Sequence, residues 1–192
     1  MARIPLASSE NLNPEQRRVH DAIVGARGGK LPGPYRLTLL HSVPVTDTWQ
    51  QLGDTLRKQI VFEPRLAELA IIVTAHHWNC RYVWHAHAPQ AIKGGLAEAP
   101  ANAIRDGQRP VFEKTDEEAI YAYCSELLRC HEVSEGTYQQ ALKLFEARGV
   151  VELTALVGYY AMVCMAIKAH DFPVQEGAAV LQPLRNQEAR TG

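Results

Sequence analysis

The twelve residues HHWNCRYVWHAH, from His76 to His87, gather side chains that can do chemistry directly behind an apolar segment. They include four histidines, one cysteine, one tyrosine and two tryptophans. Side chains of these types can bind a transition metal, act as a thiol nucleophile or transfer protons. The alternative is that these histidines have no functional role and only pack in a helical core. The segment is therefore the first candidate for a functional site.

The spacing suggests a thiol or an acid/base pair. We expect Asn79 to cap a new helix, which places Cys80 in its first turn and His87 two turns later on the same face. A thiol at a helix N-terminus feels the positive end of the helix dipole, which favours the thiolate. Glu68 on the preceding helix can fold back onto this face. A carboxylate and an imidazole that meet in an apolar pocket are suited to proton transfer.

The same spacing does not favour a metal site. Histidines one or two residues apart on a helix point in different directions, so neither His76–His77 nor His85–His87 chelates as a pair. Only His76, Cys80 and His87 could converge on one ion. We therefore expect no bound metal.

The elements that must position these residues are expected to be helices. Prolines or capping residues precede several apolar runs of helical spacing, and glycines follow some of them. No alternating apolar run is long enough to predict a strand. The expected helices run from Pro14 to the Gly28–Gly29 pair, over 35–41 and 46–58, from Pro64 onwards, and over 80–92, 98–105, 116–130, 134–148 and 150–168.

These elements predict a single all-α domain over 1–192, a compact multi-helix fold built of helical hairpins. The chain has 192 residues, 46% of them hydrophobic, which is enough for one sizeable core. The apolar segment 153–167 is expected to be a buried core helix, because its 15 residues are too few to span a bilayer. The tail at 173–192 lacks periodicity and is expected to wrap a neighbour or to fray.

Composition limits the partners and the compartment. The 20 Lys+Arg and 21 Asp+Glu residues give a formal net charge of -1 without a basic patch, so no nucleic-acid partner is expected. The N-terminus shows no secretory signal, and the four cysteines form neither a disulfide framework nor paired CxxC motifs. We therefore expect a cytoplasmic protein without a membrane partner.

Several segments together carry a resemblance to a known family. Arg65 and Glu68 form an R-x-x-E pair, and the motif YVWHAH follows at 82–87. GPYRLTLLHSVPV lies upstream at 33–45, and AIKGGL lies downstream at 91–96. Together these segments resemble the carboxymuconolactone decarboxylase and alkylhydroperoxidase D superfamily of small all-helical proteins.

The resemblance covers 32–169 and implies an alkylhydroperoxidase D-like fold. In the decarboxylase-like branch the central motif reads Y-E-W-x-x-H, and in the peroxidase branch it reads C-x-x-C-x-x-x-H. Cys80 and His87 match the ends of the second motif, whereas Val83 replaces both the glutamate of the first and the second cysteine of the other. A peroxidase cycle that closes a C-x-x-C disulfide is therefore impossible here.

The function expected from the resemblance is a cofactor-free decarboxylase-like lyase that acts on a small organic acid or lactone. His87, oriented by Glu68, would protonate the carbanion that remains when carbon dioxide leaves. Tyr82 would donate a hydrogen bond to the substrate's carbonyl oxygen, and Trp84 would form an apolar wall. Two alternatives stay open. One is a thiol peroxidase in which Cys80 becomes a sulfenic acid that an outside thiol resolves. The other is a non-catalytic protein that binds a small ligand in the same pocket.

The resemblance also implies further binding residues and an assembly. Tyr35 and His41 are expected near the pocket entrance, and Arg65 is expected to contribute to substrate binding. The superfamily commonly forms trimers or hexamers, so a homo-oligomer is expected. The apolar segment 153–167 agrees with this, because surplus apolar surface is usually buried against other copies.

Overall fold

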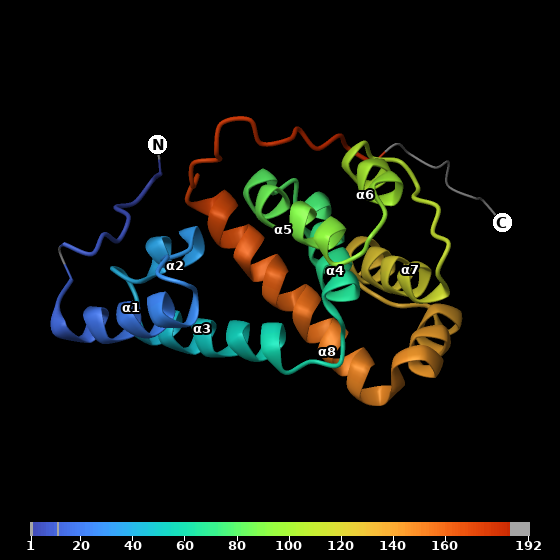
Figure 1. Ribbon diagram of the computed structural model, residues 1–192, viewed down its shortest axis with the longest axis horizontal. Helices are drawn as coiled ribbons and strands as arrows, with labels where there is room; N and C mark the ends of the chain where they lie inside the picture. The colour runs from blue at the N-terminus through green and yellow to red at the C-terminus, as the bar shows by residue number, and fades with distance from the viewer. Residues whose placement is uncertain (1, 11, 185–192) are drawn as a thin grey trace. The chain divides into compact units, whose positions relative to one another are not determined.

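The computed structural model describes residues 2–10 and 12–184, and within these ranges it contains eight helices and no strand (Figure 1). The predicted all-α class is confirmed. The described residues divide into two compact units. The first unit comprises 2–60 and 162–174, and the second comprises 61–161 and 175–184. The single-domain organisation stays a prediction.

The first unit contains α1 (Pro14–Ala26), α2 (Gly33–Thr38) and α3 (Val43–Lys58), and α3 contacts both of the others. Asn13 caps α1 as expected. Its side chain accepts a hydrogen bond from the Gln16 amide at 2.9 Å, and the Gln16 side chain accepts one from the Asn13 amide at 2.9 Å. This reciprocal pair satisfies two backbone donors that the first turn leaves open.

Two helices of the first unit begin earlier than the sequence predicted. The expected ranges were 35–41 and 46–58, but α2 and α3 start at Gly33 and Val43. Both helices carry a proline at one of their first positions, Pro34 and Pro44. Proline suits the helix start because its fixed φ is helical and its missing N–H has no partner there.

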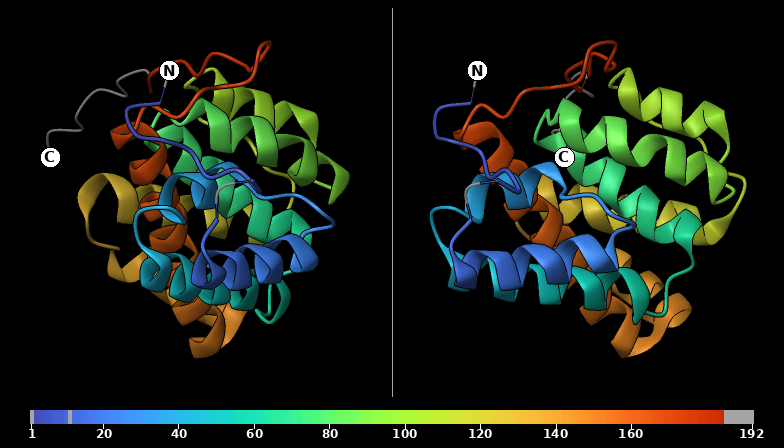
Figure 2. Two further views of the ribbon diagram at one scale, coloured as in Figure 1. Left: turned by 90° about the vertical axis from the view of Figure 1, so that its left-hand side faces the viewer. Right: turned by 60° about the vertical axis from the view of Figure 1, so that its left-hand side comes forward.

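The second unit is arranged around α4. Its helices are α4 (Pro64–His77), α5 (Arg81–Lys93), α6 (Glu98–Arg105) and α7 (Thr115–Cys130), and it shares α8 (Glu135–Ala169) with the first unit. Helix α4 contacts α5, α6 and α7, and α4, α5 and α6 lie side by side (Figure 2). Because neighbours cover several of its faces, Ile71, Ile72 and Val73 are all buried. The start at Pro64 and the range 98–105 are confirmed.

Helix α8 is two helical segments joined at Glu146, where the backbone leaves the helical region with φ 58 and ψ 177. The sequence predicted a break at Gly149, between 134–148 and 150–168. In the structure Gly149 instead lies inside the helix, where an added Cβ would stand 2.6 Å from the Cβ of Phe145. The expected core helix follows the break, with these side chains buried: Leu153, Leu156, Val157, Tyr160, Val163, Cys164 and Ile167.

Glu146→Gly is expected to be more stable than Glu146→Ala by about 1 kcal/mol. A non-glycine residue in this positive-φ conformation costs about 1–3 kcal/mol, and the greater freedom of glycine in the unfolded chain offsets about 0.5–1 kcal/mol of the relief. Urea denaturation of both variants measures the difference. An alanine variant as stable as the glycine variant would show that Glu146 is unstrained.

Among the described residues, α8 alone is long and apolar enough to cross a membrane by length and composition. Half of its most apolar window is buried inside the protein. The core helix of a water-soluble protein can be equally long and apolar, so these two properties of α8 do not by themselves assign a membrane role.

The C-terminal strap, defined here as residues 175–184, lies along the second unit. The expectation that the tail frays is wrong for these residues. The Arg81 guanidinium donates to the carbonyl oxygen of Ala179 at 2.9 Å and also to that of Ala178. The part of the predicted tail at 185–192 lies outside the described residues.

The end of the strap packs against the loop that follows α6. The Gln182 amide donates to the carbonyl oxygen of Arg105 at 2.9 Å. A Cβ added to Gly107 would stand 2.1 Å from the carbonyl oxygen of Pro183, and the backbone at Gly107 has a φ of +67. Both the positive φ and the close approach require glycine at this crossing.

Candidate acid/base site

A carboxylate and an imidazole meet between α4 and α5. The Nδ1 atom of His87 lies 2.7 Å from Oε2 of Glu68, and their side chains are 22% and 20% exposed. An ionised carboxylate can only accept, so Nδ1 carries the hydrogen and Nε2 remains to exchange a proton. The structure thus brings together the two residues that the sequence paired. Partial exposure leaves the pair within reach of a ligand.

The turn between the two helices makes this meeting possible. Helix α4 ends in a Schellman motif: the Asn79 amide donates to the carbonyl oxygen of His76 at 2.9 Å, and the Cys80 amide donates to that of Ala75 at 2.8 Å. Asn79 adopts the left-handed conformation with a φ of 46, which asparagine tolerates better than most residues. The chain reverses over these few residues, so α5 packs back along α4.

Two expectations for this turn are therefore wrong. Asn79 does not cap α5; it terminates α4. Cys80 is itself the N-cap residue of α5, which begins at Arg81, so Cys80 does not lie in the first helical turn. Cys80 is 1% exposed. Cys80 and His87 do not share one helix face, because Cys80 precedes the helix.

A tyrosine that the sequence did not single out completes the surroundings of His87. The Tyr160 ring packs edge-on against the imidazole, with ring centroids 5.0 Å apart and an interplanar angle of 83°. Tyr160 is buried and contacts the Tyr159 ring at 5.3 Å. The tyrosine pair within the apolar run of α8 was the signal in the sequence, but it does not show which helix lies opposite.

Arg65 is engaged in an internal ion-pair cluster. Its guanidinium lies 2.7 Å from Asp116 and 2.6 Å from Glu117, and it also pairs with Glu63. Arg65 is buried, and its hydrogen bonds to these carboxylates raise its pKa. The cluster joins the first turn of α4 to that of α7. The Arg65 guanidinium therefore has a structural role. The expected contact of Arg65 with substrate finds no support in this geometry.

The two arginines nearest to the site along the chain, Arg65 and Arg81, do not pair with Glu68. Arg65 is held by the carboxylates of α7 and Glu63, and Arg81 donates to the strap. Glu68 pairs with His87 instead. The carboxylate is therefore available to the imidazole without competition from these two cations.

Trp84 and Tyr82 lie on α5 close to the pair. Trp84 is buried, contacts the His76 ring edge-on at 6.4 Å, and lines a cavity of about 440 Å³ together with Pro89 and Ala101. His87 is not among the residues that line this cavity. Tyr82 is half-buried. Neither aromatic residue has a described contact with Glu68 or His87.

Tyr35 and His41 belong to the first unit, whereas Glu68 and His87 belong to the second. Tyr35 is buried; its hydroxyl accepts a hydrogen bond from Arg27 at 2.9 Å, and its ring meets Trp49 edge-on at 6.0 Å. His41 is exposed and donates from Nε2 to a backbone carbonyl at 3.0 Å. Both residues therefore make local contacts, and their expected role at a pocket entrance stays a prediction.

The described residues contain no group of three or more His, Cys, Asp or Glu side chains placed to hold a metal ion. His76, one of the three residues that could have converged on an ion, instead donates from Nε2 to the carbonyl oxygen of Gln182 at 2.8 Å. This bond fixes the strap to the end of α4.

Lowering the pH below about 6.5, the ordinary pKa of histidine, is expected to destabilise the protein partly through His76. Burial lowers the pKa of His76, although its backbone hydrogen bond opposes this shift. The unfolded chain therefore takes up a proton that the folded chain does not, and stability falls as the pH drops toward the folded pKa.

Urea denaturation between pH 5 and 7 measures this effect. His76→Gln should show a shallower loss of stability than the wild type. His85→Gln, at an exposed position on α5, serves as the control. Equal slopes for the wild type and His76→Gln would contradict the assignment.

No protein-family model matches the chain, and no curated protein matches it significantly. A function is therefore inferred from the geometry of the described residues and from the motif resemblance. Both the geometry and the motif resemblance single out the Glu68–His87 pair.

Proposed function

We propose that the protein is a cofactor-free acid/base enzyme, a carboxymuconolactone decarboxylase-like lyase that removes carbon dioxide from a small organic acid or lactone. The observation that carries the proposal is the 2.7 Å contact between Nδ1 of His87 and Oε2 of Glu68. The proposal includes an alkylhydroperoxidase D-like arrangement of the helices. The all-α fold and the hairpin of α4 and α5 are compatible with it.

In the proposed reaction, the bond between the substrate's carboxylate carbon and its neighbouring carbon breaks, and carbon dioxide leaves. The electron pair of that bond moves into a conjugated carbonyl group and forms an enolate. His87, as the imidazolium, donates the proton on Nε2 to the carbon and becomes neutral. Solvent then returns one proton to His87, so each turnover consumes one proton.

Glu68 has two roles in this proposal. Its carboxylate holds the imidazole by the hydrogen bond to Nδ1 and stabilises the imidazolium electrostatically. The edge-on packing of Tyr160 restricts rotation of the ring. Tyr82, matched to the motif, is the proposed hydrogen-bond donor to the substrate's carbonyl oxygen.

The state of the cysteines favours this lyase over a thiol peroxidase. Cys80 is 1% exposed, so a peroxide has little access to its sulfur. Cys124 and Cys164 are also buried, and burial raises the pKa of the Cys124 thiol, which suppresses its thiolate. Cys130 is exposed, but it lies at the end of α7 and belongs to no motif.

The test is carbon dioxide release from a panel of small carboxylic acids and carboxylated lactones whose carbonyl group can accept the electron pair. Release well above the rate without enzyme supports the proposal. Consumption of a hydroperoxide well above the rate of free cysteine, with no carbon dioxide from any panel member, would favour the peroxidase. Tight binding without either reaction would favour a ligand-binding protein.

We also propose a homo-oligomer, a trimer or a hexamer. The exposed side chains of α8 include Val151, Met162 and Met165, and other copies of the chain would cover such apolar surface. We expect the purified protein to sediment as a multimer at micromolar concentration. Sedimentation as a stable monomer would contradict this proposal.

A further inference from the structure

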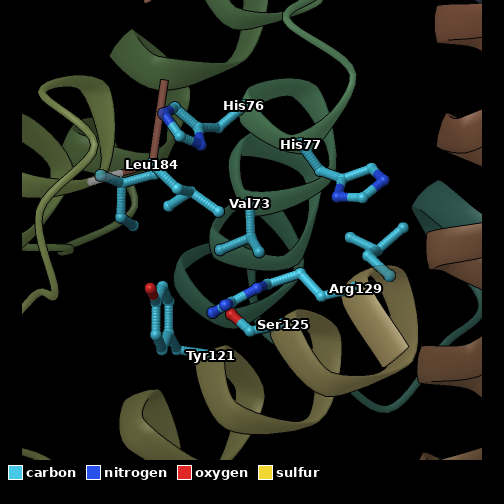
Figure 3. Close-up of a pocket in the computed structure, with 9 residues that line it drawn as sticks. Val73, His76, His77, Tyr121, Ser125, Arg129 and Leu184 are labelled. Atoms are coloured by element: carbon cyan, nitrogen blue, oxygen red, sulfur yellow. The ribbon is translucent and has the colours of Figure 1, made fainter. Parts of the chain in front are cut away.

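A small cavity lies between α4 and α7, and neither Glu68 nor His87 is among the residues that line it (Figure 3). Tyr121, Ser125 and Arg129 follow one another at four-residue spacing on α7, so they form one ridge that faces the cavity. Val73 lines it from α4, and Leu184 of the strap lines it at the end of the described chain. The cavity volume is about 20 Å³, enough for one or two water molecules.

The guanidinium of Arg129 extends into this cavity, as the close-up shows (Figure 3). Among the residues that the structure describes, no carboxylate pairs with Arg129, although other arginines of the second unit, such as Arg109 and Arg148, each have one. Ser125, one helical turn earlier, also has no described hydrogen-bond partner. Arg129 is exposed and Ser125 is half-buried, so the cavity presents to solvent a cation and a hydroxyl that a ligand can use.

Besides Arg129 and Tyr121, the titratable side chains described as lining the cavity are those of His76 and His77. Burial lowers the pKa of His77, and the charges of His131, His76 and Arg129 lower it further. No carboxylate acts on His77 in the opposite direction. Both His76 and His77 are therefore neutral at pH 7, and Arg129 is the described residue lining the cavity that carries a full positive charge. Arg109 stacks on the Tyr121 ring, 4.7 Å from its centroid, but its charge is paired with Glu118.

We infer that this cavity binds the head group of a small monocarboxylate. The planar guanidinium of Arg129 matches a carboxylate with two parallel hydrogen bonds. The hydroxyl groups of Ser125 and Tyr121 can donate to the same oxygens. One positive charge fits a monoanion, and the volume admits the head group alone. The rest of the ligand would lie outside this volume.

Calorimetric titration of the full-length protein with sodium acetate tests this site. Arg129→Gln should weaken acetate binding about tenfold or more, because hydrogen bonds to charged groups are the stronger kind. Arg148→Gln removes the same charge from an exposed ion pair and should bind within twofold of the wild type. Equal binding by the wild type and Arg129→Gln would overturn the inference.

Two further measurements distinguish acetate binding in this cavity from acetate binding elsewhere on the protein. The effect of Arg129→Gln should persist in a His87→Ala background, since acetate could also occupy the proposed acid/base site. If the effect disappears there, the cavity is not the acetate site. Sodium chloride at equal ionic strength should compete poorly, and equal competition would overturn the carboxylate class. If Arg129→Gln fails to fold, Arg129→Lys and Ser125→Ala should each weaken binding severalfold, and unchanged binding by both would overturn the inference.

Discussion

The Glu68→Gln and His87→Ala variants are each expected to release carbon dioxide about 10²–10⁴ times more slowly than the wild type. The double variant is expected to be about as slow as the slower single variant. Both substitutions disable one proton-transfer unit, so the second has little left to remove. Steady-state rates of the four proteins on one panel substrate measure the coupling.

The physical reason is the charge that forms on the imidazole. The Glu68 carboxylate lies 2.7 Å from Nδ1 of His87 in a partly desolvated position, where the attraction between opposite charges is stronger than in water. Glutamine keeps the size of the side chain but not the charge. Glu68→Gln therefore tests the electrostatic role separately from packing.

Cys80→Ser provides the control for the thiol alternative. Because Cys80 is buried before the first turn of α5, this variant is expected to keep much of the carbon dioxide release. Full activity in Glu68→Gln, or complete loss in Cys80→Ser with normal folding, would contradict the acid/base assignment.

Arg65→Met is expected to lower the free energy of unfolding by about 3–5 kcal/mol, the usual cost of removing one member of a buried ion pair. Arg65 and Glu117 have side chains only 8% and 5% exposed. The substitution leaves the Glu117 carboxylate buried without its guanidinium. Urea denaturation followed by circular dichroism measures the loss.

Arg148→Met is the matched control, because its pair with Glu152 is on the surface and its arginine side chain is 65% exposed. Exposed pairs of this kind contribute about 0–1 kcal/mol. A loss at Arg65 no larger than the loss at Arg148 would show that the cluster contributes little to stability.

The cluster also predicts a pH dependence. The hydrogen bond from Arg65 lowers the pKa of Asp116, so its contribution is present above the unfolded value of about 3.9. That contribution is lost as the pH falls through the lower folded value. Arg65→Met should therefore lose less additional stability on acidification than the wild type.

Helix starts marked by proline could be predicted from the sequence, and the connection between α4 and α5 could not. Pro64 begins α4 as expected, because proline has one favourable place in a helix. Asn79 has two: it can cap the next helix or adopt the left-handed conformation that ends the previous one. The choice depends on the packing of α4 against α5, which local sequence does not contain.

The pairing of Glu68 with His87 could be predicted because a single short turn separates their helices. The partners of Arg65 could not. Asp116 lies 51 residues further along the chain, and its acidic segment also has a local role as the favourable start of a helix. Tyr160 is a similar case, since the sequence shows an aromatic residue on an apolar helix but not what it faces.

The way in which the chain supplies the two units bears on its synthesis. The first unit needs residues 162–174 in addition to 2–60, and the second needs the strap at 175–184. The first unit cannot be completed until residue 174 has left the ribosome, and the second not until the strap has followed, although domains generally fold as units during translation. A nascent chain that stalls after α7 would lack Tyr160 of α8, which packs on His87 of α5, and the strap, which is bonded to His76 and Arg81. We therefore expect this protein to depend on chaperones during translation more than a protein of similar length whose domains are contiguous.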